Sequence, residues 1–489
     1  MASQHPDHAS RPYWHDQEFI STQYETHETY LAFSELGIGE VKWDWEGKLV
    51  DESVLERLLG EYFEYFSANP IRVEKFITFR LPNPTVETEF RLGRAFMGML
   101  SAAALAKKVE LPSPPLFEVI LPMTDSAHSM IDIQEAFREV AGLKHWLLNY
   151  QGGNLNHIEV IPLFEQVDVI THSDEILMEY VKLHEEKFGF RPKYLRPYTA
   201  RSDPAMNAGQ IPTVLAIKVA LSKYAKFSEK TGIPTYPILG CAALPFRGGL
   251  TPKNVPEFIK QYSGFRTLLL QSAFRYDYNK NDVILGIKEI DALLPQSQAQ
   301  NVTPEEEQIM QEIIATGQKL YQDSIKTVAS KINHVANFIP KRRERVQHVG
   351  LFGYSRGIGE ISLPRAIKFT AAAYSLGVPP EFYGTGRLLK YIKEKGCSDV
   401  LEKFYPSLLS DLTRAGNYLN QANLDKLGWS DISEDVKEIQ NYLGVEFKPQ
   451  TPEQVEHLNL TNFIFENIDK DPHISEQIVE AAVLRKSMG

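Results

Sequence analysis

The sequence predicts an α/β protein built as a (β/α)8 TIM-type barrel with large additional α-helical segments. Short runs rich in β-branched and aromatic residues recur along the chain, and each is followed by a stretch with helical spacing of its apolar residues. Several runs are apolar almost throughout, which is typical of parallel strands covered on both faces. Eight such units without a long structureless gap favour a closed barrel. An open doubly wound sheet is the alternative, because the number of strands does not prove closure.

The predicted strands lie within residues 40–356. They begin at Glu40 (EVKWDW), Lys75 (KFITFRLP), Phe117 (FEVILPM), Ile158 (IEVIPLFE), Tyr194 (YLRPYTA), Thr235 (TYPILGCA), Phe265 (FRTLLLQSA) and His348 (HVGLFGYS). The segment between the fifth and sixth runs, PTVLAIKVALSKYAKFSEKTG, has helical spacing and ends at Gly232. Glycine is the residue that most often follows the last turn of a helix.

A helical insertion is predicted over residues 302–340, before the last strand. Thr303 is a good N-cap, Pro304 suits the first helical position, and Glu306 completes a capping box. Residues 365–489 also have a mostly helical pattern. We therefore interpret residues 1–489 as a single elaborated barrel domain.

The composition is that of a globular protein. The 489 residues include 52 Lys and Arg against 63 Asp and Glu, a formal net charge of −11, which argues against nucleic acid or an anionic membrane as a partner. Two cysteines, Cys241 and Cys397, are too few for a disulfide framework or a thiolate zinc site. The N-terminus lacks a secretory signal, and the longest apolar run, 95–106, is shorter than the ~20 residues that span a bilayer. We expect a soluble, cytoplasmic protein.

Two carboxylates stand at the carboxyl ends of neighbouring predicted strands, where barrel enzymes carry their chemistry. Glu165 and Asp203 are 38 residues apart, about one β–α unit, so they are close enough to share Mg²⁺. The alternative is that Glu165 is a solvated or ion-paired group, and that Asp203 forms a turn before Pro204.

Several arginines also fall at predicted strand ends or in the segments that follow them. Arginine suits bidentate recognition of phosphate or carboxylate, although Arg356 and Arg365 could equally pair with helix carboxylates. The glycines beside Arg247 would let the backbone approach an anion, or would form an ordinary turn. The candidates for anion binding are Arg80, Arg201, Ser202, Arg247, Gly248, Gly249, Gln271, Ser355, Arg356 and Arg365. Together these residues indicate a metal-assisted barrel enzyme acting on an anionic small molecule.

Six segments in order resemble the archaeal-type phosphoenolpyruvate carboxylases. They are SQHPD (3–7), KWDWEGK (42–48), FEVILPMT (117–124), ARSDPAMNAG (200–209), LPFRGGL (244–250) and LFGYSR (351–356), and the resemblance extends to the final LRKSMG. It implies that phosphoenolpyruvate and bicarbonate are converted to oxaloacetate and phosphate through carboxyphosphate and the pyruvate enolate. It also implies a cofactor, Mg²⁺ or Mn²⁺, and an allosteric homotetramer.

The resemblance further implies roles for single residues. Glu165 and Asp203 would hold the metal, and His5, which by position alone would be a frayed tail, would remove the carboxyphosphate proton. Catalytic cations are expected at Arg80, Arg247, Arg356 and Arg365. Substrate contacts are expected from Arg201, Ser202, Gln271, Gly248, Gly249 and Ser355. Arg485, in the terminal LRKSMG, is a weaker candidate.

The sequence departs from the larger carboxylases at two places. Met206 stands where they carry a lysine, and Arg247 is the one cation left in the LPFRGG loop. Two other functions therefore stay open. The first is another metal-dependent barrel lyase or aldolase acting on pyruvate enolate, which would not need His5 or the Tyr-Ser-Arg and Leu-Pro-Arg segments. The second is a non-catalytic phosphoenolpyruvate-binding barrel, which Met206 favours and the pair Glu165 and Asp203 opposes.

Overall fold

Eight short parallel strands form the sheet of the computed structural model, which describes residues 1–87, 90–112, 114–143, 155–344, 357–358 and 361–489. Their order in the sheet is their order in the chain. They are β1 (Ala2–Ser3), β2 (Glu40–Asp44), β3 (Phe76–Arg80), β4 (Glu118–Leu121), β5 (Glu159–Phe164), β6 (Tyr198–Thr199), β7 (Ile238–Leu239) and β8 (Thr267–Leu268). Each neighbouring pair runs parallel.

The N-terminal strand closes the sheet into a ring. In β1, Ala2 lies opposite Val41 of β2 and also forms a parallel bridge with Leu270, just beyond β8. The backbone N–H of Ser3 donates to the carbonyl of Leu270 at 3.1 Å, and the N–H of Leu270 donates to the carbonyl of Met1 at 2.8 Å. The predicted barrel is therefore confirmed, and the open doubly wound sheet is wrong.

Seven of the eight strands, β2 to β8, fall inside predicted runs, and β1 was not predicted. The run at His348, predicted as the last strand, lies outside the described residues. Two residues are too few to show an alternating or apolar pattern, so β1 is defined only by its backbone partners.

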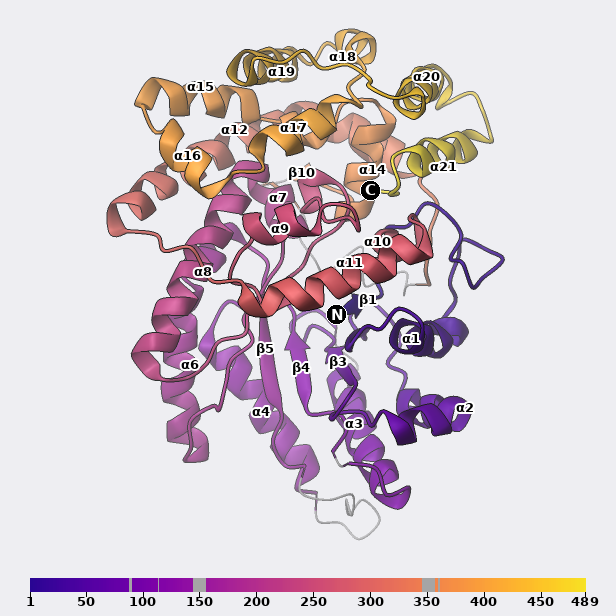
Figure 1. The fold of residues 1–489 in the computed structure, drawn as a ribbon, viewed down its shortest axis with the longest axis vertical. Helices are drawn as coiled ribbons and strands as arrows, with labels where there is room; N and C mark the ends of the chain where they lie inside the picture. Colours follow the sequence, from indigo (N-terminus) through magenta and orange to yellow (C-terminus); the bar gives the residue numbers. More distant parts are fainter. Residues whose placement is uncertain (88–89, 113, 144–154, 345–356, 359–360) are drawn as a thin grey trace.

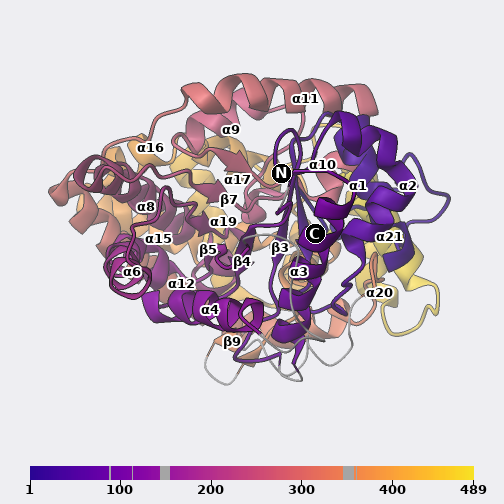
Figure 2. The same cartoon turned by 90° about the horizontal axis from the view of Figure 1, so that it is seen from below.

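Side chains from the strands and from the segments just beyond them fill the barrel. Helices surround the barrel (Figure 2). The interior cluster consists of Ile120, Ile161, Leu163, Tyr198, Ile238 and Leu269. Bulky side chains of this kind pack the interior of such barrels. The first part of the chain contains α1 (Glu25–Ser34), α2 (Val54–Ala68), α3 (Arg91–Lys108), α4 (Ala127–Ala141), α5 (Val167–Thr171), α6 (Ser173–Phe188), α7 (Ser202–Ala208), α8 (Gln210–Thr231), α9 (Val255–Gln261), α10 (Ser272–Tyr276), α11 (Lys280–Leu293) and the 3-10 turns η1 (Thr22–Tyr24), η2 (Pro245–Arg247) and η3 (Leu294–Gln296).

The long helix α12 (Pro304–Ala336) links the barrel to the rest of the chain. Its predicted capping box is present: the Thr303 hydroxyl accepts from the Glu306 N–H, and the Glu306 carboxylate accepts from the Thr303 N–H. One side of α12 packs on α8 and another on α14 (Ala366–Ser375). Its last turns therefore reach the end of the barrel where the strands finish.

The remaining helices form a layer over that end of the molecule (Figure 1). They are α15 (Thr385–Lys395), α16 (Ser398–Phe404), α17 (Leu408–Gly416), α18 (Gln421–Leu427), α19 (Ser430–Leu443), α20 (Pro452–Asn467) and α21 (Ile474–Leu484), with η4 (Pro380–Phe382) and a small antiparallel pair, β9 (Gly357–Ile358) and β10 (Ile361–Ser362). This layer is the large additional helical part that the sequence predicts.

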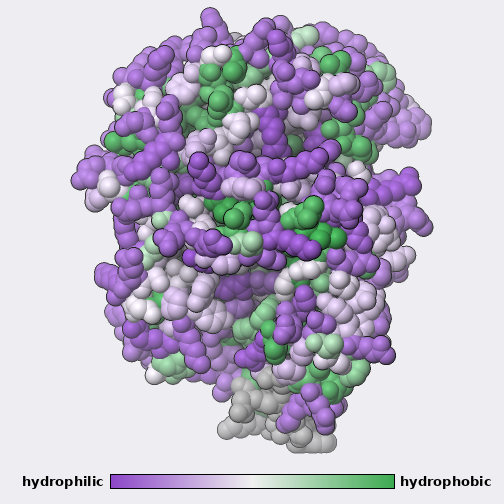
Figure 3. Space-filling view, viewed as in Figure 1, coloured by the Kyte–Doolittle hydropathy of each residue, from purple (hydrophilic) through white to green (hydrophobic). Residues whose placement is uncertain are grey.

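The face of the molecule in Figure 3 is mostly hydrophilic, with hydrophobic residues in small scattered groups. Within the described residues, no helix has both the length and the apolar character needed to cross a membrane. Cys241 and Cys397 are both unbridged.

Candidate active site

A cavity of about 890 Å³ opens at the carboxyl ends of the strands. Its described lining from the barrel includes Glu46, Arg80, Glu165, Arg201, Ser202, Asp203, Arg247 and Gln271. The N-terminal segment contributes His5, and the segments around α12 and α14 contribute Lys341, Arg342, Arg343, Arg365 and Lys368. Cationic side chains outnumber acidic ones in this lining by eight to three, although the whole chain carries a net charge of −11. The cavity is suited to an anionic ligand.

The two predicted metal ligands come from neighbouring strands. Glu165 follows β5, and Asp203 lies in the first turn of α7, directly after β6. β5 and β6 pair in parallel, so both carboxyl groups reach the same cavity. Among the described residues, no group of three or more His, Cys, Asp or Glu comes together as a metal cluster. Two carboxylates, completed by water and substrate oxygens, fit Mg²⁺ or Mn²⁺ better than a metal that needs several protein ligands.

Arg247 is a buried cation of the cavity with a partner at each guanidinium nitrogen. It is 2% exposed, and its Nε donates to Ser202 at 3.1 Å while its Nη2 donates to Gln271 at 2.7 Å. A third contact runs from Nη1 to the backbone oxygen of Gly489, and Asp7 lies 3.6 Å from the same nitrogen. Burial lowers the pKa of this guanidinium, and Asp7 opposes that shift. Arg247 is thus a desolvated cation fixed in one orientation.

Arg80, at the end of β3, already has two acidic partners. Its Nε and Nη2 donate to the two carboxylate oxygens of Asp44 at 2.5 and 2.7 Å, and its Nη1 pairs with Glu46. Burial by itself would lower the pKa of Arg80, but Asp44 and Glu46 raise it well above its ordinary value. Any substrate anion would have to compete with these carboxylates for Arg80.

Arg201 supports the loop that carries Arg247. Its guanidinium donates to Tyr262 at 3.0 Å and to the carbonyls of Phe246 and Pro245 at 2.9 and 3.4 Å. Gly248 and Gly249 of this loop line a second, smaller cavity of about 330 Å³ and are not among the described residues lining the large one. Both have positive φ, +125° and +85°, which glycine adopts without strain. Their predicted contact with substrate stays a prediction.

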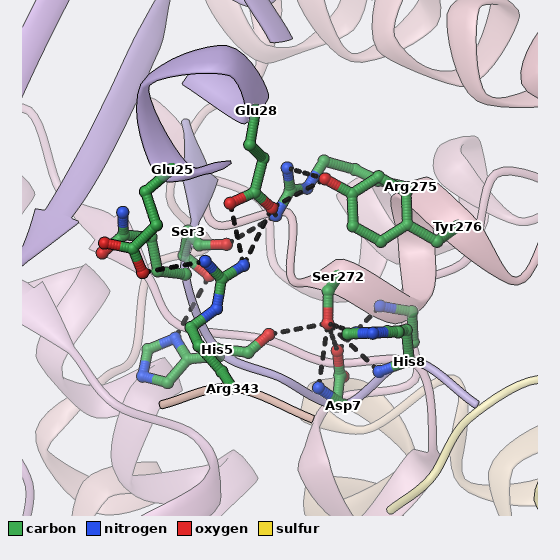
Figure 4. A network of polar contacts seen from close by, with 12 residues as sticks. Ser3, His5, Asp7, His8, Glu25, Glu28, Ser272, Arg275, Tyr276 and Arg343 are labelled. Carbon is green, nitrogen blue, oxygen red and sulfur yellow. Dashed lines mark hydrogen bonds and ion pairs between the residues drawn. The ribbon is translucent and has the colours of Figure 1, made fainter. Parts of the chain in front are cut away.

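His5 is part of an ordered segment and not a frayed tail. Its Nδ1 lies 3.1 Å from the hydroxyl of Ser3, and its backbone carbonyl accepts from the Ser272 hydroxyl at 2.8 Å (Figure 4). The backbone N–H of Asp7 donates to the same hydroxyl oxygen at 2.9 Å. Ser272 begins α10, 267 residues from His5, so the end of the barrel fixes the position of the N-terminal segment.

A buried cluster of ion pairs lies beside Ser3 (Figure 4). Arg343 donates to both oxygens of Glu28 at 2.9 and 2.8 Å, and Arg275 lies 3.3 Å from the same carboxylate. Burial alone would raise the pKa of Glu28, but Arg343 and Arg275 lower it to about 2. Arg275 also donates to the backbone carbonyl of Ser3 at 2.7 Å. The cluster therefore holds the strand that presents His5.

The other predicted residues have different outcomes. Arg365 lines the cavity as the N-cap residue of α14, whereas Ser355 and Arg356 lie outside the described residues. Arg485 is buried, and it donates to the carbonyl of Met488 at 2.6 Å. Met206 is buried in α7 and is not among the described residues that line the cavity, so it supplies no substitute for the lysine of the larger carboxylases.

Sequence reasoning missed a basic group at the outer wall of the cavity. Lys341, Arg342 and Arg343 follow α12, and Lys368 belongs to α14. The run KRR at 341–343 is the signal that could have found three of them. Residues at or near the carboxyl ends of predicted strands are the candidates that a barrel indicates. Lys341 and Lys368 do not lie at such an end, so they were missed.

A closed ring of parallel strands with two carboxylates, a histidine and buried arginines at its carboxyl end defines a barrel enzyme for an anionic substrate. The comparisons with known proteins then narrow the class. A family model described as phosphoenolpyruvate carboxylase matches residues 1–489. The chain belongs to the phosphoenolpyruvate carboxylase family, whose members are carboxy-lyases.

Individual relatives align over at least 90% of this chain. A phosphoenolpyruvate carboxylase of Leuconostoc mesenteroides is 38% identical over 497 aligned positions, covering 100% of this chain and 98% of the relative. That of Metallosphaera sedula is 35% identical over 514 positions, covering 100% and 99%. That of Pyrococcus horikoshii is 36% identical over 452 positions, covering 90% and 92%. The resemblance to the archaeal-type enzymes is confirmed.

Proposed function

We propose that this chain converts phosphoenolpyruvate and bicarbonate to oxaloacetate and phosphate in the large cavity. The observation that carries this assignment is that His5, Glu165, Asp203 and Arg247 all line one cavity, although they come from four distant parts of the sequence. Its excess of cations is suited to a phosphorylated carboxylate, and its volume admits both substrates together.

Glu165 and Asp203 are the residues we assign to a divalent metal, Mg²⁺ or Mn²⁺. Bound there, the metal would supply a Lewis acid that stabilises negative charge on the enolate oxygen. Arg247 and Arg365 would hold the phosphate oxygens, as would Arg356. Ser202 and Gln271 would act mainly on Arg247, because both accept hydrogen bonds from it.

His5 is the base we assign to the second step. In the first step a bicarbonate oxygen attacks phosphorus, the bond from phosphorus to the enol oxygen breaks, and carboxyphosphate and the enolate form. His5 then takes the carboxyl proton of carboxyphosphate, the bond from carbon to the bridging oxygen breaks, and CO₂ and phosphate result. The enolate carbon then bonds to CO₂. The contact between Nδ1 and Ser3 supports this role, because it orients the imidazole where His5 lines the cavity.

The biological setting is also inferred from the family resemblance. We infer a cytoplasmic homotetramer with allosteric regulation. Sedimentation equilibrium of the purified protein would test the oligomeric state, and a monomer at micromolar concentration would contradict it.

The deciding experiment is formation of oxaloacetate from phosphoenolpyruvate, bicarbonate and Mg²⁺, followed by its coupled reduction to malate. We expect a product that depends on both bicarbonate and metal. Absence of a bicarbonate-dependent product with both Mg²⁺ and Mn²⁺ would refute the assignment. Binding of phosphoenolpyruvate without turnover would favour a non-catalytic binding protein.

A further inference from the structure

The loop that carries Arg247 is held from the helical layer as well as from the barrel. Residues 242–250 run from the end of β7 through η2. Arg414 of α17 donates to the carbonyls of Gly249 and Ala243 at 3.0 and 2.7 Å. Glu381 of η4 accepts the backbone N–H of Phe246 at 2.8 Å, one residue before Arg247. The helical layer thus contacts the backbone at Phe246, the residue directly before Arg247.

The carboxyl group of Glu381 has an uneven set of partners. The residue is 0% exposed, and its Oε1 accepts both the Phe246 N–H and the Tyr374 hydroxyl, each at 2.8 Å. Its Oε2 is buried and has no hydrogen-bond partner among the described residues. Burying an ionised carboxylate with one oxygen that has no hydrogen bond costs free energy of folding. A proton on that oxygen removes the buried negative charge.

The surroundings favour the acid form. Asp411 is a second buried acid nearby, and burial raises the pKa of the neighbouring hydroxyls of Tyr374 and Tyr383 well above their ordinary values. Burial also raises the pKa of Glu381 itself to about 7. With no guanidinium or ammonium group hydrogen-bonded to it in the described chain, little offsets the cost of a buried negative charge.

We propose that Glu381 is a positioning residue whose buried carboxyl oxygen fixes the peptide beside Arg247 and thereby aims that guanidinium into the cavity. The ring of Phe246 packs between Tyr321 and Phe369, at centroid distances of 6.2 and 5.8 Å. Its side chain is therefore set by packing and its backbone by Glu381. This role rests on the proposed function of Arg247 in binding the substrate anion.

A small shift of this peptide has a large effect, because Arg247 donates to Ser202 and Gln271, which follow the two strands on either side of β7. A displacement of about 1 Å at a catalytic group can lower turnover by roughly 100-fold. Loss of the Glu381 contact leaves the Phe246 N–H buried and without its acceptor, so the loop must move to satisfy it.

The test compares Glu381→Gln with Glu381→Leu, two substitutions of similar size. Gln keeps the oxygen that accepts from Phe246 and carries no charge, so we expect kcat/KM within about 3-fold of wild type. Leu removes the acceptor, so we expect kcat to fall about 10- to 100-fold and KM for phosphoenolpyruvate to rise. Tyr374→Phe is the matched control. It removes the other donor to Oε1 but keeps the Phe246 contact, and we expect kcat/KM within about 3-fold of wild type.

Hydrogen exchange of the loop, measured by mass spectrometry, gives a readout that does not depend on turnover. We expect faster exchange over 242–250 in Glu381→Leu and wild-type exchange in Glu381→Gln. Activity and exchange unchanged by Leu would overturn the positioning role. Damage by Gln equal to that by Leu would overturn it too, because Gln keeps the oxygen that accepts from Phe246. A wild-type enzyme that makes no oxaloacetate would refute the proposed function instead, and the exchange data would still test the loop.

Discussion

At the scale of single residues, the candidate site depends on pairs that the sequence does not reveal. The Ser3 hydroxyl meets the His5 imidazole two residues away, and Arg247 meets Gln271 and Asp7, which lie in other segments of the chain. Such contacts fix the orientation of an imidazole or a guanidinium. One prediction tests the contact of His5 with Ser3, and a second tests the assignment of Asp203 to the metal.

Ser3→Ala removes the partner of His5 Nδ1. We expect kcat for oxaloacetate formation to fall about 3- to 10-fold, because the imidazole loses a contact that orients it for proton removal. Ser34→Ala, at an exposed serine of α1, is the control. His5→Asn is the second variant. Because the base for carboxyphosphate is lost, this variant should form no oxaloacetate and should leave bicarbonate-dependent hydrolysis to pyruvate. Unchanged carboxylation in both variants would remove His5 from the mechanism.

Asp203→Asn replaces one of the two carboxylates assigned to the metal. We expect kcat/KM to fall by at least about 100-fold, with weaker binding of Mn²⁺ measured directly by electron paramagnetic resonance. Asp168→Asn, at an exposed acid of α5, should bind Mn²⁺ as wild type does. If Asp203→Asn bound Mn²⁺ normally and kept its turnover at low metal concentration, the ligand assignment would be wrong.

At the scale of elements, sequence reasoning succeeded where the pattern was local. β2 to β8 each have an apolar or β-branched run, and α12 has a capping box, so both were predicted. The sequence did not predict β1, because two residues are too few to show a periodic pattern of apolar side chains. Only their backbone pairing with β2 and with Leu270 identifies them as a strand. The spacing of neighbouring strands is also a local pattern, so it could predict that Glu165 and Asp203 line one cavity. The contact of Ser272 with His5 could not be predicted, because nothing in the sequence joins residues 267 positions apart.

The capping box of α12 gives a prediction for an element. Thr303→Ala should lower the free energy of unfolding by about 1 kcal/mol, because the Glu306 N–H loses its acceptor at the helix start. Activity at 25 °C should be unchanged, since the cavity is lined by the other end of the helix, at Asn333 and Ala336. Thr451→Ala, in the equivalent capping box of α20, should show a similar loss in urea denaturation. No change in either variant would contradict the capping argument.

At the scale of the whole molecule, charge is unevenly distributed. A chain with a net charge of −11 repels a multiply charged anion at long range, yet eight cations and three acids line the described part of its cavity. The charge of Arg80 is neutralised by its ion pairs with Asp44 and Glu46. The positive electrostatic potential at the outer wall of the cavity therefore comes mainly from groups such as Lys341 and Lys368. Burial lowers the pKa of Lys368, and its neighbour Lys341 lowers it further, a repulsion that a bound anion would relieve.

This distribution predicts how salt should affect catalysis. Salt screens the attraction between the cavity and phosphoenolpyruvate, with a Debye length of about 10 Å at 0.1 M. We therefore expect kcat/KM to fall about 3- to 10-fold between roughly 20 and 200 mM KCl, mainly through KM. Lys341→Gln with Lys368→Gln should lower kcat/KM at low salt and flatten its salt dependence. Lys326→Gln with Lys390→Gln makes the same change of charge at lysines outside the cavity lining and is the control. If kcat/KM rose with salt, repulsion by the net negative charge would outweigh the local cations, and the outer wall would not guide the substrate.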